Sequence, residues 1–147
     1  MKILLHTEAD TQALGARLAG LARAGDAILL SGPLGAGKST LARAFLRAAS
    51  GQPELVVPSP SYTLVQAYPV LDETTAWHFD LWRLDGPEAG RESLAELGWE
   101  EARQGIVLVE WPERLGEATP SDALHVTLAL AGETARQATL TGWQDRL

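Results

Sequence analysis

Eight residues restrict the folds open to this chain more than any others: GPLGAGKS, at positions 32–39. They match the pattern G-x-x-x-x-G-K-[ST] in full, and they stand between a compact apolar run at 26–30 and an apolar-rich run at 38–49. A strand that passes through a glycine-rich turn into a helix points backbone N–H groups and the positive end of the helix dipole at one spot, which suits a phosphate. The sequence therefore predicts a strand, a phosphate-binding loop and a helix in succession.

The lysine of this loop stands out because the chain has only two lysines, Lys2 and Lys38, against ten arginines. A compact ammonium group on a flexible stem can reach the terminal phosphates of a nucleotide, whereas the guanidinium of arginine is bulkier and fixed in shape. The alternative is a glycine-rich turn before an ordinary helix, but a chance match in the correct context is uncommon. The residues expected to bind the nucleotide are Gly35, Ala36, Gly37, Lys38, Ser39 and Thr40, and the Ser39 hydroxyl is expected to bind Mg²⁺.

A carboxylate is expected close to the metal, and Glu110 is the candidate. It ends the apolar run GIVLVE at 105–110, which is typical of a strand buried on both faces. A carboxylate there is costly to bury without a cation. We expect Glu110 to hold Mg²⁺ opposite Ser39, directly or through a water. The alternative is a surface glutamate at the end of a strand.

Asp80 is the second acidic candidate, in the strand predicted from AWHFDLW at 76–82. Alternation places His78 and Asp80 on one face of that strand. Because aspartate is disfavoured inside strands, we expect Asp80 to position the attacking water, act as a general base or contact Mg²⁺ through water. The alternative is a structural aspartate paired with Arg83 or capping a turn. His78 is expected to be a hydrogen-bonded structural residue rather than a catalytic one.

The rest of the chain indicates one α/β domain spanning residues 1–147. A short strand is expected at 2–6, a capping box at 7–10 opens a helix that Gly25 can end, and residues 87–103 are expected to be helical with an interruption near Gly98. Two extended runs at 124–130 and 135–141 predict a terminal hairpin. We therefore expect a P-loop NTPase fold with a central mixed, largely parallel sheet, flanking helices and a C-terminal β-hairpin.

Composition excludes several classes of protein. The chain has no cysteine, which excludes disulfides, thiolate zinc sites and cysteine nucleophiles. No apolar run approaches the length of a membrane span, and the N-terminus turns polar too early for a secretory signal, so a cytoplasmic protein with no membrane contact is expected. The net charge of −7 argues against a chain that binds nucleic acid by itself.

Four segments together resemble one family. GPLGAGKST, SPSYTLVQAY, HFDLWRL and VLVEWPER, in this order and spacing, look like the bacterial TsaE (YjeE) family. The first segment is common among NTPases, whereas HFDLWRL followed by VEWPER is far more specific, although Trp82 stands where the family usually has tyrosine. The resemblance covers most of the chain, from the first helix through the terminal hairpin.

This resemblance implies an ATPase that uses ATP and Mg²⁺ and works with two partner proteins, TsaB and TsaD. Together they modify adenosine to threonylcarbamoyladenosine next to the anticodon of tRNAs that read ANN codons, and tRNA would be reached only through the complex. By motif, Lys38 and Ser39 match the phosphate-loop lysine and the metal-binding hydroxyl, Glu110 the metal-binding glutamate, and Asp80 the functionally important aspartate. Arg136, in GETAR, corresponds to a nucleotide-contacting arginine of the terminal hairpin.

Three other functions share part of this pattern. A GTPase of the Ras type is disfavoured because an N-K-x-D motif needs a lysine that the chain lacks. A small-molecule kinase would share the phosphate loop but needs an acceptor pocket and a mobile basic lid. A scaffold whose assembly is set by bound nucleotide would not need hydrolysis. No arginine finger is identifiable in the sequence, so we expect slow hydrolysis by the isolated chain and a site that partners complete or stimulate. The chain itself is expected to be a monomer or part of a partner-dependent complex.

Overall fold

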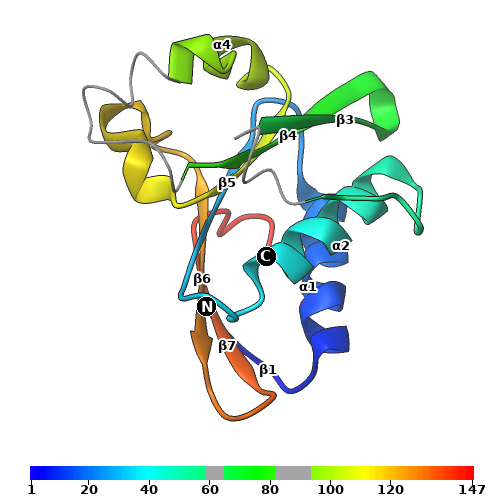
Figure 1. Ribbon diagram of the computed structural model, residues 1–147, viewed down its shortest axis with the longest axis vertical. Helices are drawn as coiled ribbons and strands as arrows, with labels where there is room; N and C mark the ends of the chain where they lie inside the picture. The colour runs from blue at the N-terminus through cyan, green and yellow to red at the C-terminus, as the bar shows by residue number, and fades with distance from the viewer. Residues whose placement is uncertain (59–64, 82–93) are drawn as a thin grey trace.

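The computed structural model describes residues 1–58, 65–81 and 94–147 of the chain (Figure 1). In this part, seven strands form one sheet in the order β1-β7-β6-β2-β5-β4-β3. The strands are β1 (Lys2–Leu5), β2 (Ala27–Ser31), β3 (Val65–Val70), β4 (Thr74–Asp80), β5 (Ile106–Glu110), β6 (Leu124–Leu130) and β7 (Arg136–Thr141). The helices are α1 (Glu8–Leu21), α2 (Lys38–Ser50) and α4 (Trp99–Ala102), with 3₁₀ turns η1 (Leu71–Glu73) and η2 (Pro112–Ala118).

The sheet is mixed, as expected, but it is less parallel than the sequence predicted. The strands β6, β2, β5 and β4 pair in parallel and form its centre. The pairs β1–β7, β6–β7 and β3–β4 are antiparallel, and of these three pairs only the β6–β7 hairpin was expected from the sequence. The other two arise because the N-terminal strand returns to pair with the last strand, and β3 and β4 are joined by the short turn η1. The predicted C-terminal hairpin is confirmed as β6 and β7.

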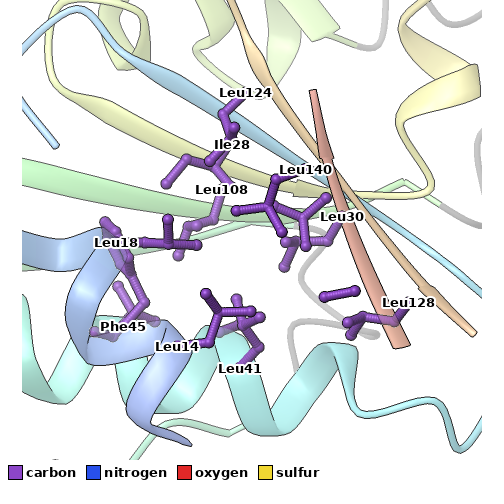
Figure 2. Packing of buried hydrophobic residues seen from close by; sticks show 14 of the residues in the cluster. Leu14, Leu18, Ile28, Leu30, Leu41, Phe45, Leu108, Leu124, Leu128 and Leu140 are labelled. Atoms are coloured by element: carbon purple, nitrogen blue, oxygen red, sulfur yellow. The ribbon is translucent and has the colours of Figure 1, made fainter. Parts of the chain in front are cut away.

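Two apolar layers cover the two faces of the sheet. Alternate residues of β2 separate into them: Ile28 and Leu30 belong to one buried cluster, and Ala27 and Leu29 to the other. The first cluster is closed by α1 and α2, and the second by α4 and η2. Figure 2 shows side chains of α1 and α2 pointing toward the leucines of the sheet. This arrangement buries β5 on both faces, as its apolar run predicted.

The helices begin close to where the sequence placed them. Thr7 caps α1 with the predicted capping box, in which Asp10 is the reciprocal partner. The helix ends at Leu21, four residues before Gly25. Helix α2 ends at Ser50, and its C-cap residue Gly51 has a left-handed backbone. The two helices lie side by side (Figure 1) and approach closely at Gly15, where a Cβ would lie 2.7 Å from the Leu41 carbonyl oxygen.

Some predictions fall on residues outside the described ranges. These are the expected helix before residue 94, the end of the strand predicted at 76–82, and the alternative pairing of Asp80 with Arg83. Most of the resembling segment SPSYTLVQAY also lies outside the described residues. From residue 94 onward the predicted interruption is confirmed, because Gly98 has a left-handed backbone ahead of α4. None of the helices among the described residues is both long and apolar enough to cross a membrane.

Candidate functional site

The glycine-rich loop at 32–37 leaves the carboxyl end of β2 and leads directly into α2. Its three glycines all have positive φ angles, which other residues rarely adopt. At Gly32 there is also no room for a side chain, because a Cβ there would lie 2.5 Å from the Leu128 carbonyl oxygen of β6. Gly37 is the N-cap of α2, and it offers no side chain to the first turn. The first backbone N–H groups of α2 therefore have no capping side chain and suit an anion.

Lys38, the first residue of α2, is buried although its side chain carries a charge. The residue is only 7% exposed, and its Nζ donates a hydrogen bond of 2.7 Å to the Gly32 carbonyl oxygen. The same Nζ lies 4.7 Å from the ring centroid of Trp111, a cation–π contact. Trp111 follows β5 directly and has a left-handed backbone with φ of 60°. Trp111 therefore lies beside the lysine of the loop.

Glu110 ends β5 at the same edge of the sheet as the loop. In the parallel pairing of β2 with β5, Glu110 lies opposite Leu30, two residues before the loop begins. Glu110 is 5% exposed, which contradicts the alternative of a surface glutamate. Its Oε2 lies 2.7 Å from Nε2 of His78 on the neighbouring strand β4. The buried carboxylate is therefore hydrogen bonded at one of its two oxygens.

Asp80 completes an acidic strand end beside Glu110. The register of β4 with β5 pairs the two residues directly, so their side chains share the face that α1 and α2 cover. Asp80 is buried and is engaged with other residues of the chain. Phe79 and Leu81 point to the other face and its apolar cluster, as the alternation predicted.

Arg136 brings the C-terminal hairpin to the loop. It is the first residue of β7, and its Nε and Nη2 both donate to the Gly35 carbonyl oxygen, over 3.2 and 3.1 Å, from 101 residues away in the sequence. Its Nη1 donates to the Ala135 carbonyl oxygen over 2.8 Å. The guanidinium of the terminal hairpin therefore lies against the glycine-rich loop, and its contact with a nucleotide stays a prediction.

A pocket of about 500 Å³ opens between the loop, the start of α1 and the hairpin. Sequence reasoning did not find the residues of α1 and the hairpin turn that line it, apart from Arg136. Their contact depends on three segments that are distant in sequence, so no local pattern signals it. The lining residues are Thr7, Glu8, Thr11, Gly35, Gly37, Thr40, Glu133, Thr134 and Arg136.

The donor set of the site fits Mg²⁺ and a chain of phosphates. Ser39 is exposed in the first turn of α2, and its hydroxyl and the Glu110 carboxylate are the oxygen donors that Mg²⁺ prefers. Among the described residues, no group of three or more His, Cys, Asp or Glu could hold a metal by itself. Mg²⁺ is commonly held by one or two protein oxygens together with substrate phosphates and waters. Beside Gly35 there is open space where a side chain would otherwise stand.

Fold and site together define a class: mixed α/β proteins with a glycine-rich lysine loop between a central parallel strand and a helix, and acidic residues at the neighbouring strand ends. Within this class the sequence comparisons are specific. The family model of the threonylcarbamoyl adenosine biosynthesis protein TsaE matches residues 5–138, and the chain therefore belongs to the TsaE family.

Individual relatives agree with this assignment. A protein from a Nostoc strain named tRNA threonylcarbamoyladenosine biosynthesis protein TsaE is 38% identical over 95% of this chain and 85% of its own length. Proteins of the same name from Rickettsia felis and Bacillus subtilis are 33% and 30% identical, over 91% and 93% of this chain and 75% and 82% of their own lengths. The crystal structure of Bacillus subtilis YdiB superposes with a TM-score of 0.75 at 28% identity, covering 99% of this chain and 87% of that one.

Proposed function

We propose that the chain is a Mg²⁺-dependent ATPase with a single P-loop NTPase domain, which supports threonylcarbamoyladenosine modification of tRNA. The modified base would be the adenosine next to the anticodon of tRNAs that read ANN codons. The chain would act in the cytoplasm with TsaB-like and TsaD-like proteins and would reach tRNA through them. Its membership of the TsaE family and the names of its relatives support the pathway.

One observation carries the ATPase part of the proposal: a buried lysine at the start of α2 that, among the described residues, has no charged side chain as its hydrogen-bond partner. Lys38 Nζ is held by a backbone carbonyl and an aromatic ring. These are weak partners for a buried ammonium group compared with phosphate oxygens, because charge-assisted hydrogen bonds are stronger than neutral ones. ATP would therefore draw Lys38 to its terminal phosphates, while the N–H groups from Gly35 to Thr40 hold the rest of the phosphate chain.

The acidic strand ends would complete the site for hydrolysis. When bound, Mg²⁺ neutralises the charge that develops on the terminal phosphates. Ser39 and Glu110 would hold it through their side-chain oxygens. Asp80, buried beside Glu110, would orient the attacking water and accept its proton as the bond to the leaving ADP breaks. Hydrolysis by the isolated chain would be slow, and partners would complete or order the site.

The pocket beside the loop would hold the nucleoside. It shares Gly35, Gly37 and Thr40 with the loop, so a nucleotide whose phosphates lie there can extend into it. Its other walls offer hydroxyl and carboxylate oxygens from the start of α1 and from the hairpin turn, which suit ribose hydroxyls and an exocyclic amine. Arg136 lies at the boundary between the phosphate loop and this pocket.

Reconstitution of the tRNA modification tests the proposal. Modification would be measured with TsaB-like and TsaD-like proteins, with and without this chain, in the presence of ATP or a non-hydrolysable analogue. We expect repeated turnover only with this chain and hydrolysable ATP. Full turnover with the analogue would favour the nucleotide-set scaffold, and phosphate transfer to a metabolite instead of water would favour the kinase. Turnover that is unaffected by omitting the chain would overturn the proposal.

A further inference from the structure

The buried contact between His78 and Glu110 is a close polar interaction at the site that the proposed function leaves unused. His78 is 2% exposed, and its Nε2 lies 2.7 Å from Oε2 of Glu110. The two residues come from the neighbouring parallel strands β4 and β5, and their side chains share one face of the sheet. An imidazole and a carboxylate buried this deeply are costly unless they are hydrogen bonded, so their pairing fixes both side chains.

The other ring nitrogen indicates which atom carries the proton. Within the described residues, Nδ1 of His78 is buried and has no hydrogen-bond partner. A proton on Nδ1 would therefore be a buried donor without an acceptor, and it would leave the lone pair of Nε2 facing a carboxylate oxygen. The tautomer with the proton on Nε2 avoids both costs. Nε2–H then donates to Oε2, and Oε1 remains as the carboxylate oxygen that His78 does not occupy.

We propose that His78 is a positioning residue that holds Glu110 for Mg²⁺. By anchoring Oε2, it fixes the rotamer of a flexible side chain before the metal arrives, so this conformational entropy is lost on folding and not on binding. Oε1 is then presented to the metal or to a water on it. Hydrogen-bonded partners of metal ligands commonly act in this way. The inference rests on the proposed role of Glu110 and adds a residue to it.

A purely structural role for His78 makes a different prediction. If the pair only stabilised the contact between β4 and β5, its loss would lower the free energy of unfolding and leave the Mg²⁺ requirement of the folded protein unchanged. If His78 positions Glu110, its loss raises the Mg²⁺ concentration needed for nucleotide binding in protein that is still folded. The two roles therefore separate in a Mg²⁺ titration.

Three variants and the wild-type chain make the test. His78→Leu removes the donor and keeps a similar volume, whereas His78→Gln retains an N–H donor of similar reach. His125→Leu is the matched control, because His125 is exposed on β6. Calorimetry would follow binding of a non-hydrolysable ATP analogue as Mg²⁺ is raised, and again with the metal chelated. Nitrogen NMR of the wild-type ring, without ligand, would show which nitrogen carries the proton.

We expect His78→Leu to need roughly 10–100-fold more Mg²⁺ than wild type, the usual effect of losing such a partner, with unchanged affinity for the analogue when Mg²⁺ is absent. His78→Gln should recover most of the loss, and His125→Leu should match wild type. The ring NMR should show the proton on Nε2. An unchanged Mg²⁺ requirement in folded His78→Leu, or a proton on Nδ1, would overturn the positioning role while the proposed ATPase stands. If His78→Leu fails to fold, His78→Ala takes its place. A wild-type Mg²⁺ requirement in folded His78→Ala, or a Mg²⁺ requirement in His78→Gln as high as in His78→Ala, would then overturn the positioning role. Failure of the wild-type chain to bind the analogue with Mg²⁺ would overturn the proposed function and this inference together.

Discussion

Under the proposed function, nucleotide binding depends most directly on Lys38. Its replacement by alanine should lower ATP affinity about 10–100-fold, because a charge-assisted hydrogen bond contributes about 1.5–3 kcal/mol. Lys2→Ala is a matched control, since the chain's other lysine is exposed on the edge strand β1. Calorimetric titration of each variant with Mg²⁺ and ATP measures the effect. Equal affinity of Lys38→Ala and Lys2→Ala would contradict the predicted role of Lys38.

Glu110 can be altered with little disturbance to its buried neighbour. Glu110→Gln keeps an oxygen that accepts the hydrogen bond from His78 Nε2, so the variant should fold. It removes the negative charge proposed to hold Mg²⁺, so we expect some nucleotide affinity to remain, a raised Mg²⁺ requirement for binding, and at least a tenfold loss of Mg²⁺-dependent hydrolysis, which is about 1.4 kcal/mol in the barrier. Phosphate release is the measurement, with Glu113→Gln, an exposed residue of η2, as the control. Wild-type hydrolysis in Glu110→Gln would remove the carboxylate from the metal site.

Individual residues differed in how far the sequence could predict them. The places of Lys38 and Ser39 at the start of α2 followed from a short pattern that also fixes the local backbone. The burial of Glu110 followed from the apolar run before it. The pairing of Glu110 with His78 could not be predicted, because the two are 32 residues apart and their contact depends on which strands become neighbours. The cation–π contact of Lys38 with Trp111 depends on the same strand order.

At the scale of elements, the glycines of the loop are required both by their backbone conformation and by the lack of room for a side chain at Gly32. Gly35→Ala would meet open space but keep a left-handed φ of 79°, whereas Gly32→Ala would also collide with the Leu128 carbonyl oxygen. A left-handed conformation costs an alanine about 1–2 kcal/mol, so Gly35→Ala should destabilise by about that amount and Gly32→Ala by more. Urea unfolding compares the two variants. Equal losses would mean that contact with β6 does not constrain the loop.

The hairpin acts on the loop through Arg136. Arg136→Lys keeps the charge but cannot make both hydrogen bonds that Nε and Nη2 give to the Gly35 carbonyl oxygen. We expect ATP affinity to fall about threefold to tenfold in this variant, as for the loss of one hydrogen bond of about 1 kcal/mol. The same titration applies, with Arg114→Lys on η2 as the control. Unchanged affinity would show that the guanidinium geometry does not matter for the nucleotide.

Element types were easier to predict than their pairing. The strand at β5, the hairpin of β6 and β7, and the start of α2 were visible in local periodicity and in glycine positions. The return of β1 to pair with β7 was not, since a four-residue strand carries no signal of its partner. That single pairing accounts for part of the antiparallel character that the sequence reading underestimated, and it brings the start of α1 toward the hairpin.

For the whole molecule, ligand binding and fold stability should be linked. The pocket proposed to hold the nucleoside is built from the start of α1, the loop and the hairpin, which meet only in the folded chain. A ligand that binds the folded state alone stabilises it by about 2.7 kcal/mol at a concentration one hundred times its Kd. For a chain of this size, the melting temperature should rise by roughly 5–10 °C, at roughly 2–4 °C for each kcal/mol. Thermal unfolding with and without Mg²⁺ and ATP measures the rise.

The two lysines again separate specific binding from general effects of salt and nucleotide. Lys38→Ala should lose most of the rise in melting temperature, and Lys2→Ala should keep it. Addition of ATP after chelation of Mg²⁺ should give a smaller rise, because Ser39 and Glu110 would then have no metal to hold. If ATP bound in calorimetry but left the melting temperature of the wild-type chain unchanged, the ligand would not depend on the folded arrangement of α1, loop and hairpin, and the binding site would have to lie elsewhere.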